Sequence, residues 1–394
     1  MVKTMGVGVS RSEKSERAIT ESIAAATRHF ESEPDLVLSW VTEGYDRRQV
    51  AETASRCAPV TCGCSAWGAV TPEGVLTRGI ATIALQTDRP VIGPVVGPLD
   101  AGDHLGSGHR LGRTLLGEDI HSRLGLGIVY SNSSEHGHEF VAGFYGAVGP
   151  GFPLFGCATW DTASNRYVYS NGRLVEHGAL AIALGAVERI ESVVRHGWTP
   201  LSPPALATRA ADGELLLDGK PAWEVYADLL PADRTDLRSD GVDRAGRTVA
   251  ERLQRLGLEF PLGTPTYSGQ YVVHDAEFVP GQDRPVCRSA VFEGSLVRIM
   301  QITAEDLLNA AGEAASVCRG PAGLAGVLGT TCLTRLMFYD GGYEAERKVL
   351  EAEIGKQGPF AVLPAFGEIG SFEGGPASHF NKTFILVPLR SGGE

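Results

Sequence analysis

The sequence predicts an α/β fold built from repeated strand–helix–strand–strand units that form mixed sheets flanked by helices. Three observations support this fold class. Short apolar runs alternate with helical segments. Several of the runs are almost continuously apolar, as strands buried on both faces are. Similar segments also recur in the same order along the chain. The 394 residues allow about two or three domains, and we predict a first domain over residues 1–200 and a second over residues 201–394.

The recurrence is clearest at two glycine–cysteine turns and at the apolar runs on either side of them. Ser39 precedes Gly63 by 24 residues, and Ser131 precedes Gly156 by 25. Three matches in one order at nearly fixed spacing indicate an internal duplication. The matching pairs are residues 63–67 with 156–160, 35–39 with 126–131, and 79–85 with 178–184.

The first unit begins with an alternating strand over residues 5–10. A helix is expected over residues 12–33, where Ile19 and Ile23 recur at helical spacing and Pro34 ends the pattern. The remaining expected elements are a strand over 36–41, a short helix over 46–56, and strands over 60–64 and 80–85.

The second unit follows a segment rich in Gly, Pro and His, residues 87–117, in which we expect a strand and a helix around residues 110–116. The order of the first unit then returns. Its expected elements are a strand over 125–130, a polar loop over 131–138, a helix over 139–148, and strands over 153–157, 167–169 and 178–184.

The second half of the chain starts near Pro203-Pro204. Asp218-Gly219 is a hairpin signal, Pro221 fits the first turn of a helix, and Thr303 with Asp306 three residues later resembles a capping box. A third, weaker copy of the unit is expected after this helix. The expected elements are strands over 271–279 and 286–292, a helix over 304–317, a strand over 324–328, a helix over 344–354, and strands over 360–363 and 383–389.

Composition narrows the class of protein and its partners. With 43% hydrophobic and 21% charged residues, the chain is typical of a globular protein. A net charge of −12 argues against nucleic acid and anionic membranes as partners, because both attract basic surfaces. The N-terminus lacks the apolar core of a signal peptide, and no run approaches the ~18 residues of a membrane span. Seven cysteines, an odd number, favour reduced thiols and a cytoplasmic location.

Short motifs in both halves of the chain resemble the FIST domain family of prokaryotic sensory proteins, with FIST N and FIST C regions in tandem over nearly the whole chain. The motifs are Gly63-Cys64-Ser65, Gly156-Cys157, His196-Gly197-Trp198, Asp218-Gly219-Lys220-Pro221-Ala222 with Tyr226, Cys332 with Arg335, Phe366-Gly367-Glu368-Ile369-Gly370, and His379-Phe380-Asn381-Lys382-Thr383.

The resemblance implies binding of a small ligand, for which amino acids or their derivatives are proposed in the family. Some members bind heme and sense nitric oxide through partner signalling enzymes. The FIST regions use all 394 residues, so we expect no attached kinase, cyclase or receptor module. Signalling in trans through a separate protein and conversion to an enzyme are both open readings.

Cys64 and Cys157 stand in equivalent turns at the carboxyl ends of strands, the edge where α/β sheets bind ligands. Each thiol would be a nucleophile if its pKa were lowered, and would otherwise be a small buried apolar group. We expect both turns to line a pocket. Their neighbours Ser65, Trp67, Thr159 and Trp160 are therefore candidate ligand contacts.

The polar stretch from Ser131 to Glu139 precedes a helix, so its hydroxyls and amides could hold an anion or a carboxylate. His136 and His138 are candidates for a general base or for an axial heme ligand. The alternative is a capped surface loop. No metal-ion site is predicted, because Cys62-Gly63-Cys64 lacks the second pair of ligands that zinc sites use.

A C-terminal set of candidates consists of Arg335, Glu368, His379 and Asn381, which belong to the family-like motifs. Arg335 would clamp a carboxylate, and Glu368 would bind an ammonium group, so that together they suit an amino acid. The alternative is an arginine–glutamate pair that positions a turn.

Three functions therefore remain in view. The first is a small-molecule-binding sensory protein that signals in trans. The second is a stand-alone enzyme of specialised metabolism that uses Cys64, Cys157, His136 or His138. The third is a heme-binding nitric oxide sensor. No phosphate loop, dinucleotide fingerprint or nucleophile elbow is found in the sequence, and the sequence leaves the ligand, the cofactor, the partner and the oligomeric state open.

Overall fold

The computed structural model describes residues 2–117, 125–133, 136–149, 151–159, 166–186, 189–211, 214–231, 247–281, 285–320, 323–372 and 375–391. The chain forms two compact units. The first combines Met1–His196 with Leu308–Glu394, and the second is Gly197–Leu307. The predicted domain bounds, residues 1–200 and 201–394, therefore stay a prediction.

The first unit contains three repeats of one connectivity. In the first repeat, β2 pairs in parallel with β3 and antiparallel with β6, and β1 lies outside β6. The elements are β1 (Val2–Ser10), α1 (Ser15–Thr27), β2 (Leu36–Val41), α2 (Arg47–Cys57), β3 (Thr61–Ser65), β4 (Ala69–Thr71), β5 (Gly74–Leu76) and β6 (Ile80–Thr87).

The second repeat has the same order: β8 pairs in parallel with β9 and antiparallel with β12, and β7 lies outside β12. Its elements are β7 (Val91–Pro98), α3 (His104–Leu116), β8 (Leu126–Ser131), α4 (Gly137–Val148), β9 (Leu154–Ala158), β10 (Tyr167–Ser170), β11 (Arg173–Glu176) and β12 (Gly178–Leu184).

The third repeat is interrupted after its first strand by the second compact unit. Here β23 pairs in parallel with β24 and antiparallel with β27, and β13 lies outside β27. The elements are β13 (Val193–Arg195), α8 (Ala304–Cys318), β23 (Leu324–Cys332), the 3₁₀ helix η1 (Leu333–Phe338), α9 (Glu344–Ile354), β24 (Phe360–Ala365), β25 (Glu368–Gly370), β26 (Ser378–Phe380) and β27 (Phe384–Arg390).

Each repeat sends its short hairpin to a neighbouring sheet. The hairpin β4–β5 pairs with β24 of the third repeat, β10–β11 pairs with β3 of the first, and β25–β26 pairs with β9 of the second. The exchange closes a ring of three six-stranded sheets. The predicted mixed sheets and strand–helix–strand–strand order are therefore confirmed, while the internal duplication remains a hypothesis that this recurring connectivity supports.

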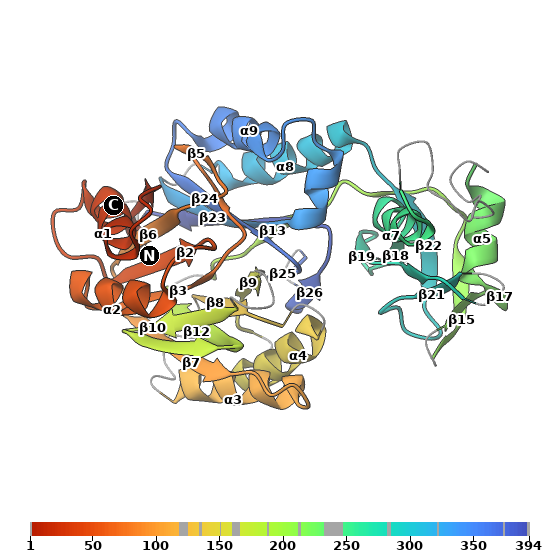
Figure 1. Cartoon of the computed structure of the whole chain (residues 1–394), viewed down its shortest axis with the longest axis horizontal. Helices are drawn as coiled ribbons and strands as arrows, with labels where there is room; N and C mark the ends of the chain where they lie inside the picture. The colour runs from red at the N-terminus through yellow and green to blue at the C-terminus, as the bar shows by residue number, and fades with distance from the viewer. Residues whose placement is uncertain are drawn as a thin grey trace. The chain divides into compact units, whose positions relative to one another are not determined.

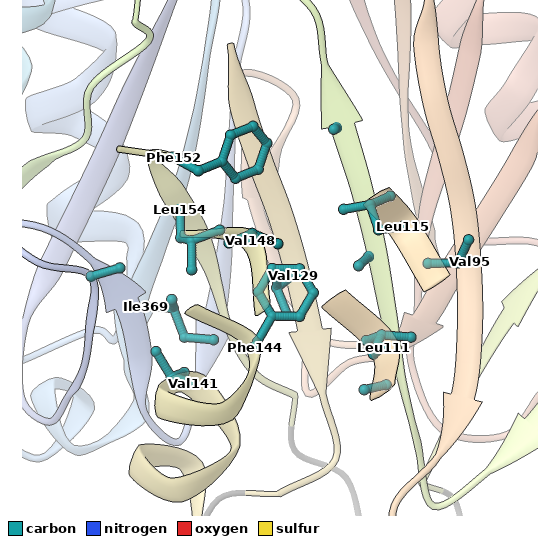
Figure 2. Close-up of a cluster of buried hydrophobic side chains, with 14 of the residues drawn as sticks. Val95, Leu111, Leu115, Val129, Val141, Phe144, Val148, Phe152, Leu154 and Ile369 are labelled. Atoms are coloured by element: carbon teal, nitrogen blue, oxygen red, sulfur yellow. The ribbon is translucent and has the colours of Figure 1, made fainter. Parts of the chain in front are cut away.

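The helices lie on the outside of the first unit, around the three sheets (Figure 1). Val37 and Val41 of β2 pack against residues of α1 and α2. Because side chains alternate along a strand, Trp40 faces the opposite, inner side of its sheet. The same alternation places Tyr130 on the inner side of β8, since its neighbour Val129 packs with Phe144 of α4 (Figure 2).

Helices α3 and α4 run parallel with their backbones in close contact. A β-carbon at Gly108 or Gly112 would meet the backbone of α4, and one at Gly143 would meet the backbone of α3. These glycines therefore set the helix separation, and Leu111 and Leu115 pack beneath the pair (Figure 2). The helix expected around residues 110–116 begins earlier, at His104, because the Asp103 side chain caps its first turn.

The second unit is built on a seven-stranded sheet packed against α5 and α7. The Asp218-Gly219 hairpin is confirmed, with positive φ at both residues (50° and 77°). Thr303 and Asp306 make the expected reciprocal cap of α8, because the backbone amide of each donates to the side chain of the other. The elements are β14 (Thr199–Pro200), β15 (Ala205–Ala211), β16 (Glu214–Leu217), β17 (Lys220–Pro221), α5 (Ala222–Leu229), α7 (Val249–Glu259), β18 (Leu262–Pro265), β19 (Tyr271–His274), β20 (Glu277–Val279), β21 (Val286–Arg288) and β22 (Leu296–Gln301). Among the helices of the described residues, none has the length and apolar character needed to cross a bilayer.

Candidate functional site

The candidate site lies where the second and third repeats meet. Strand β25 pairs with β9 so that Glu368 stands opposite Cys157. The Ala158 amide donates to the Gly367 carbonyl (2.8 Å), and His379 pairs with Ile369 across the hairpin. This junction therefore brings together candidates from the two halves of the sequence.

Glu368 is fully buried at this junction. Its carboxylate accepts hydrogen bonds from the Gly367 amide (3.2 Å), the Thr383 amide (3.1 Å) and the Thr383 hydroxyl (2.8 Å). Burial raises the pKa of Glu368 to about 8, although these hydrogen bonds oppose the rise. At neutral pH the buried group is therefore mainly the protonated acid.

A backbone amide at or just before the start of β6, β12 and β27 donates to a side chain in each repeat. In the first two repeats that side chain is neutral. The amide of Gly79, just before β6, donates to the Thr42 hydroxyl (2.7 Å). The amide of Gly178, at the start of β12, donates to the Asn132 side-chain oxygen (3.0 Å). In the third repeat the matching amide, that of Thr383, donates to Glu368. Of the three side chains that accept these backbone hydrogen bonds, only Glu368 carries an acidic group.

Arg335 is buried and is already hydrogen-bonded to other residues of the chain. Its Nε donates to Glu346 (2.6 Å) and its Nη2 donates to the Tyr339 hydroxyl (3.1 Å). Thr331 donates to the other oxygen of Glu346 (3.0 Å). The arginine–glutamate pair considered from the sequence is therefore present, with Glu346 rather than Glu368 as the direct partner. Arg335 is thus paired inside the protein with Glu346, and its role as a carboxylate clamp remains a prediction.

The polar loop after β8 is fixed by its own hydrogen bonds. The Asn132 side chain donates to the Thr159 hydroxyl (2.8 Å), the Ser133 amide donates to the Ser131 hydroxyl (3.0 Å), and the Ser133 hydroxyl lies 3.0 Å from Nδ1 of His104. Ser133 is 5% exposed. The predicted loop therefore presents an ordered polar wall, although its residues 134 and 135 lie outside the described part of the chain.

Three histidines from different elements surround the start of α4. The rings of His104 and His136 stack with centroids 4.4 Å apart. The imidazole of His379 lies against both Gly137 and Gly367, at each of which a β-carbon would collide with it. Together with Glu139 these histidines form a partly exposed rim around the start of α4. One carboxylate oxygen of Glu139 lies 3.4 Å from Nδ1 of His136. Sequence reasoning missed His104, whose place at the start of a glycine-rich helix was the available signal.

The residues around His136 and His138 do not fit a heme. A porphyrin needs a broad apolar slot beside its axial ligand. The described partners of His136 are His104 and Glu139, and His138 lies 3.9 Å from Glu139. These neighbours are polar, so we derive no step through heme. Within the described residues, no group of His, Cys, Asp and Glu side chains is arranged to hold a metal ion.

Both candidate cysteines are fully buried. Burial raises the pKa of the Cys64 and Cys157 thiols, so each stays protonated at neutral pH. This favours the interpretation as small buried groups over that as nucleophiles. The two predicted glycine–cysteine turns are strand segments in the structure: Cys64 lies in β3 and Cys157 in β9, each one residue before its strand ends.

The remaining candidate residues do not lie together. The Ser65 hydroxyl accepts from the Tyr167 amide (3.3 Å) on a hairpin of the second repeat. Trp67 packs edge-on against Tyr343 of the third repeat, with ring centroids 5.9 Å apart. Asn381 is half-buried between β26 and β27. Trp160 lies outside the described residues, so its predicted role stays a prediction.

Comparison with protein families agrees with this architecture. Residues 35–219 match the FIST N domain, and residues 222–371 match the FIST C domain. No curated protein matches the chain significantly.

Proposed function

The chain belongs to the FIST family, with FIST N and FIST C domains in tandem, and from this premise we propose that it is a small-molecule-binding sensory protein. The domains are regarded as sensory, small-ligand-binding domains, which gives the class of activity. We place the ligand at the junction of the second and third repeats. The observation that carries this choice is the rim formed by His104, Ser133, His136 and His379 above the buried Glu368.

We propose an amino acid or an amino acid derivative as the ligand. The first-turn amides of α4 face this rim, and the N-cap residue His136 makes no side-chain cap to them. Together with the nearby Ser133 hydroxyl they form a suitable environment for a carboxylate. The Glu139 carboxylate, half-exposed on the same turn, offers a partner for the ammonium group.

We propose that signalling passes to a separate protein, as in family members that act through partner signalling enzymes. We propose a cytoplasmic setting because all seven cysteines are free. Buried, protonated thiols support this sensory role over the enzyme that uses Cys64 or Cys157.

Titration calorimetry against the twenty amino acids and their N-acyl and decarboxylated derivatives tests the proposal. We expect at least one to bind, and Ser133→Ala to weaken that binding about tenfold, the loss of one hydrogen bond to a charged group. Ser55→Ala is the matched control, because Ser55 is an exposed helix residue of the first repeat. A panel without binding, or equal effects of the two substitutions, would contradict the proposed ligand site.

A further inference from the structure

In each of the three sheets, one residue of the incoming hairpin stands directly opposite the middle of the host strand. These cross-strand pairs are Tyr169 with Gly63, Ile369 with Gly156, and Val70 with Val362. The central strand of each sheet adds a third residue beside the pair, in the same order Ser39, Val129 and Gly329. We call each set of three a recognition row, and the rows differ in size and polarity.

The first recognition row places a large hairpin side chain over two small host residues. A β-carbon at Gly63 would collide with the ring of Tyr169. The ring therefore crosses β3, and its hydroxyl interacts with that of Ser39 on β2, the next strand of the sheet. The Ser39 hydroxyl lies 2.9 Å from the hydroxyl of Thr82 on β6. All of these residues but Gly63 are known to be buried polar or aromatic groups, so this row suits a hairpin residue with a polar end.

The other two recognition rows are apolar and distribute their volume differently. Ile369 packs in one hydrophobic cluster with Val129 of its host sheet (Figure 2). In the third row the host strand itself carries the branched side chain, Val362, and a β-carbon at Gly329 would meet it. The incoming residue there is Val70, the smallest of the three hairpin residues, and it is fully buried.

The parallel strand of the same repeat is the competing host for each hairpin, because β4 follows β3, β10 follows β9 and β25 follows β24 along the chain. On β9, the hydroxyl of Tyr169 would be buried against Val129 without a polar partner. On β24, Ile369 would stand opposite Val362 and crowd it. On β3, Val70 would leave empty the space that the Tyr169 ring fills. Each competing pairing is therefore poorer than the observed one.

We propose that the recognition rows determine which sheet each hairpin joins. A hairpin is accepted where the size and polarity of its central residue complement the two host residues, and is disfavoured on the parallel strand of its own repeat. The rows thus act as specificity determinants for the exchange of hairpins within the first compact unit. This inference does not depend on the proposed ligand or its site.

The first test converts the first recognition row into the residues of the second. Tyr169→Ile and Ser39→Val should each lower the urea midpoint of the intact chain, one through lost volume and the other through the lost hydroxyl. The double variant carries the isoleucine, glycine and valine of the second row, so its loss should be smaller than the sum of the two single losses. Tyr167→Ile with Ser39→Val is the matched control, because Tyr167 is a buried tyrosine two residues away on the same strand, and its effects should add.

The second test opens the host strand of the third recognition row. Val70→Tyr should lower the urea midpoint because the ring meets Val362, and adding Val362→Gly should recover about half of that loss or more. A double variant that folds where Val70→Tyr does not fold also counts as recovery. Val70→Tyr with Val387→Gly is the control, because Val387 is an equally buried valine of the same sheet that lies two strands away from β24. Additive effects in either test pair, or equal recovery in its control, would overturn the proposal.

Discussion

Replacement of Glu368 by glutamine should remove a large pH dependence of stability. In the folded chain the pKa of Glu368 is raised from 4.5 to about 8, chiefly by burial. The folded state therefore holds a proton that the unfolded state releases between these two pH values. The stabilisation is complete below pH 4.5 and is lost as the pH rises toward 8.

The size of the effect follows from this difference. A rise of 3.5 pKa units, from 4.5 to about 8, corresponds to at most ~5 kcal/mol of unfolding free energy at ~1.4 kcal/mol per unit. Glutamine stays neutral, and its side-chain oxygen can keep the two Thr383 hydrogen bonds made by one oxygen of Glu368. It loses only the bond from the Gly367 amide, at a cost of about 1 kcal/mol.

The assay is urea unfolding of the wild-type chain and Glu368→Gln at intervals from pH 5 to pH 9. The wild type should be slightly more stable at pH 5, and Glu368→Gln should be more stable at pH 9, so that the two curves cross. Glu52→Gln is the control, because Glu52 is exposed. Parallel curves for wild type and Glu368→Gln would refute the raised pKa and the burial argument behind it.

Three further substitutions or reactions test other parts of the structure. Arg335→Leu leaves Glu346 buried without its cation and should cost about 3–5 kcal/mol of unfolding free energy; Arg335→Leu with Glu346→Leu should recover part of it, and no recovery would argue against the pair. Gly367→Ala should cost ~1–3 kcal/mol of unfolding free energy, because φ is 108° and the methyl group meets His379. This loss of stability should exceed that of Gly219→Ala, where φ is 77° but no atom lies near the added methyl group. Equal losses for the two substitutions would exclude the His379 contact. An aromatic disulfide reagent should modify only Cys57 rapidly in the folded chain, because the other six cysteines are buried; a fast reaction that persists in Cys57→Ala would contradict this.

Local sequence patterns were sufficient for the central strands and several helices. Continuous apolar runs predicted β2, β6 and β12, and the helix over residues 344–354 is observed with the same limits. These elements follow from side-chain periodicity, which is a local property. The helix α3 was predicted too short because its glycine-rich first half has low helix propensity, which close packing on α4 overrides.

The pairing of strands that lie far apart along the chain could not be predicted from the sequence. Strand β4 pairs with β24 through Val70 and Val362, which are 292 residues apart in the sequence. The three residues of β4 carry no signal for that partner. The partner of Arg335 was also not identified from the sequence, although Glu346 lies only 11 residues further along the chain, on α9. Cys157, Glu368 and His379 were predicted as candidates from motifs, but their meeting depends on the β25–β26 hairpin joining β9.

The exchange of hairpins among the three sheets has a consequence for how the chain can be divided. A single repeat cut from the protein would keep an exposed strand edge where another repeat's hairpin belongs, and its own hairpin would have no host. Isolated repeats should therefore aggregate or reassociate. Complementary fragments, by contrast, should restore one another when expressed together, as interlocking parts of one ring.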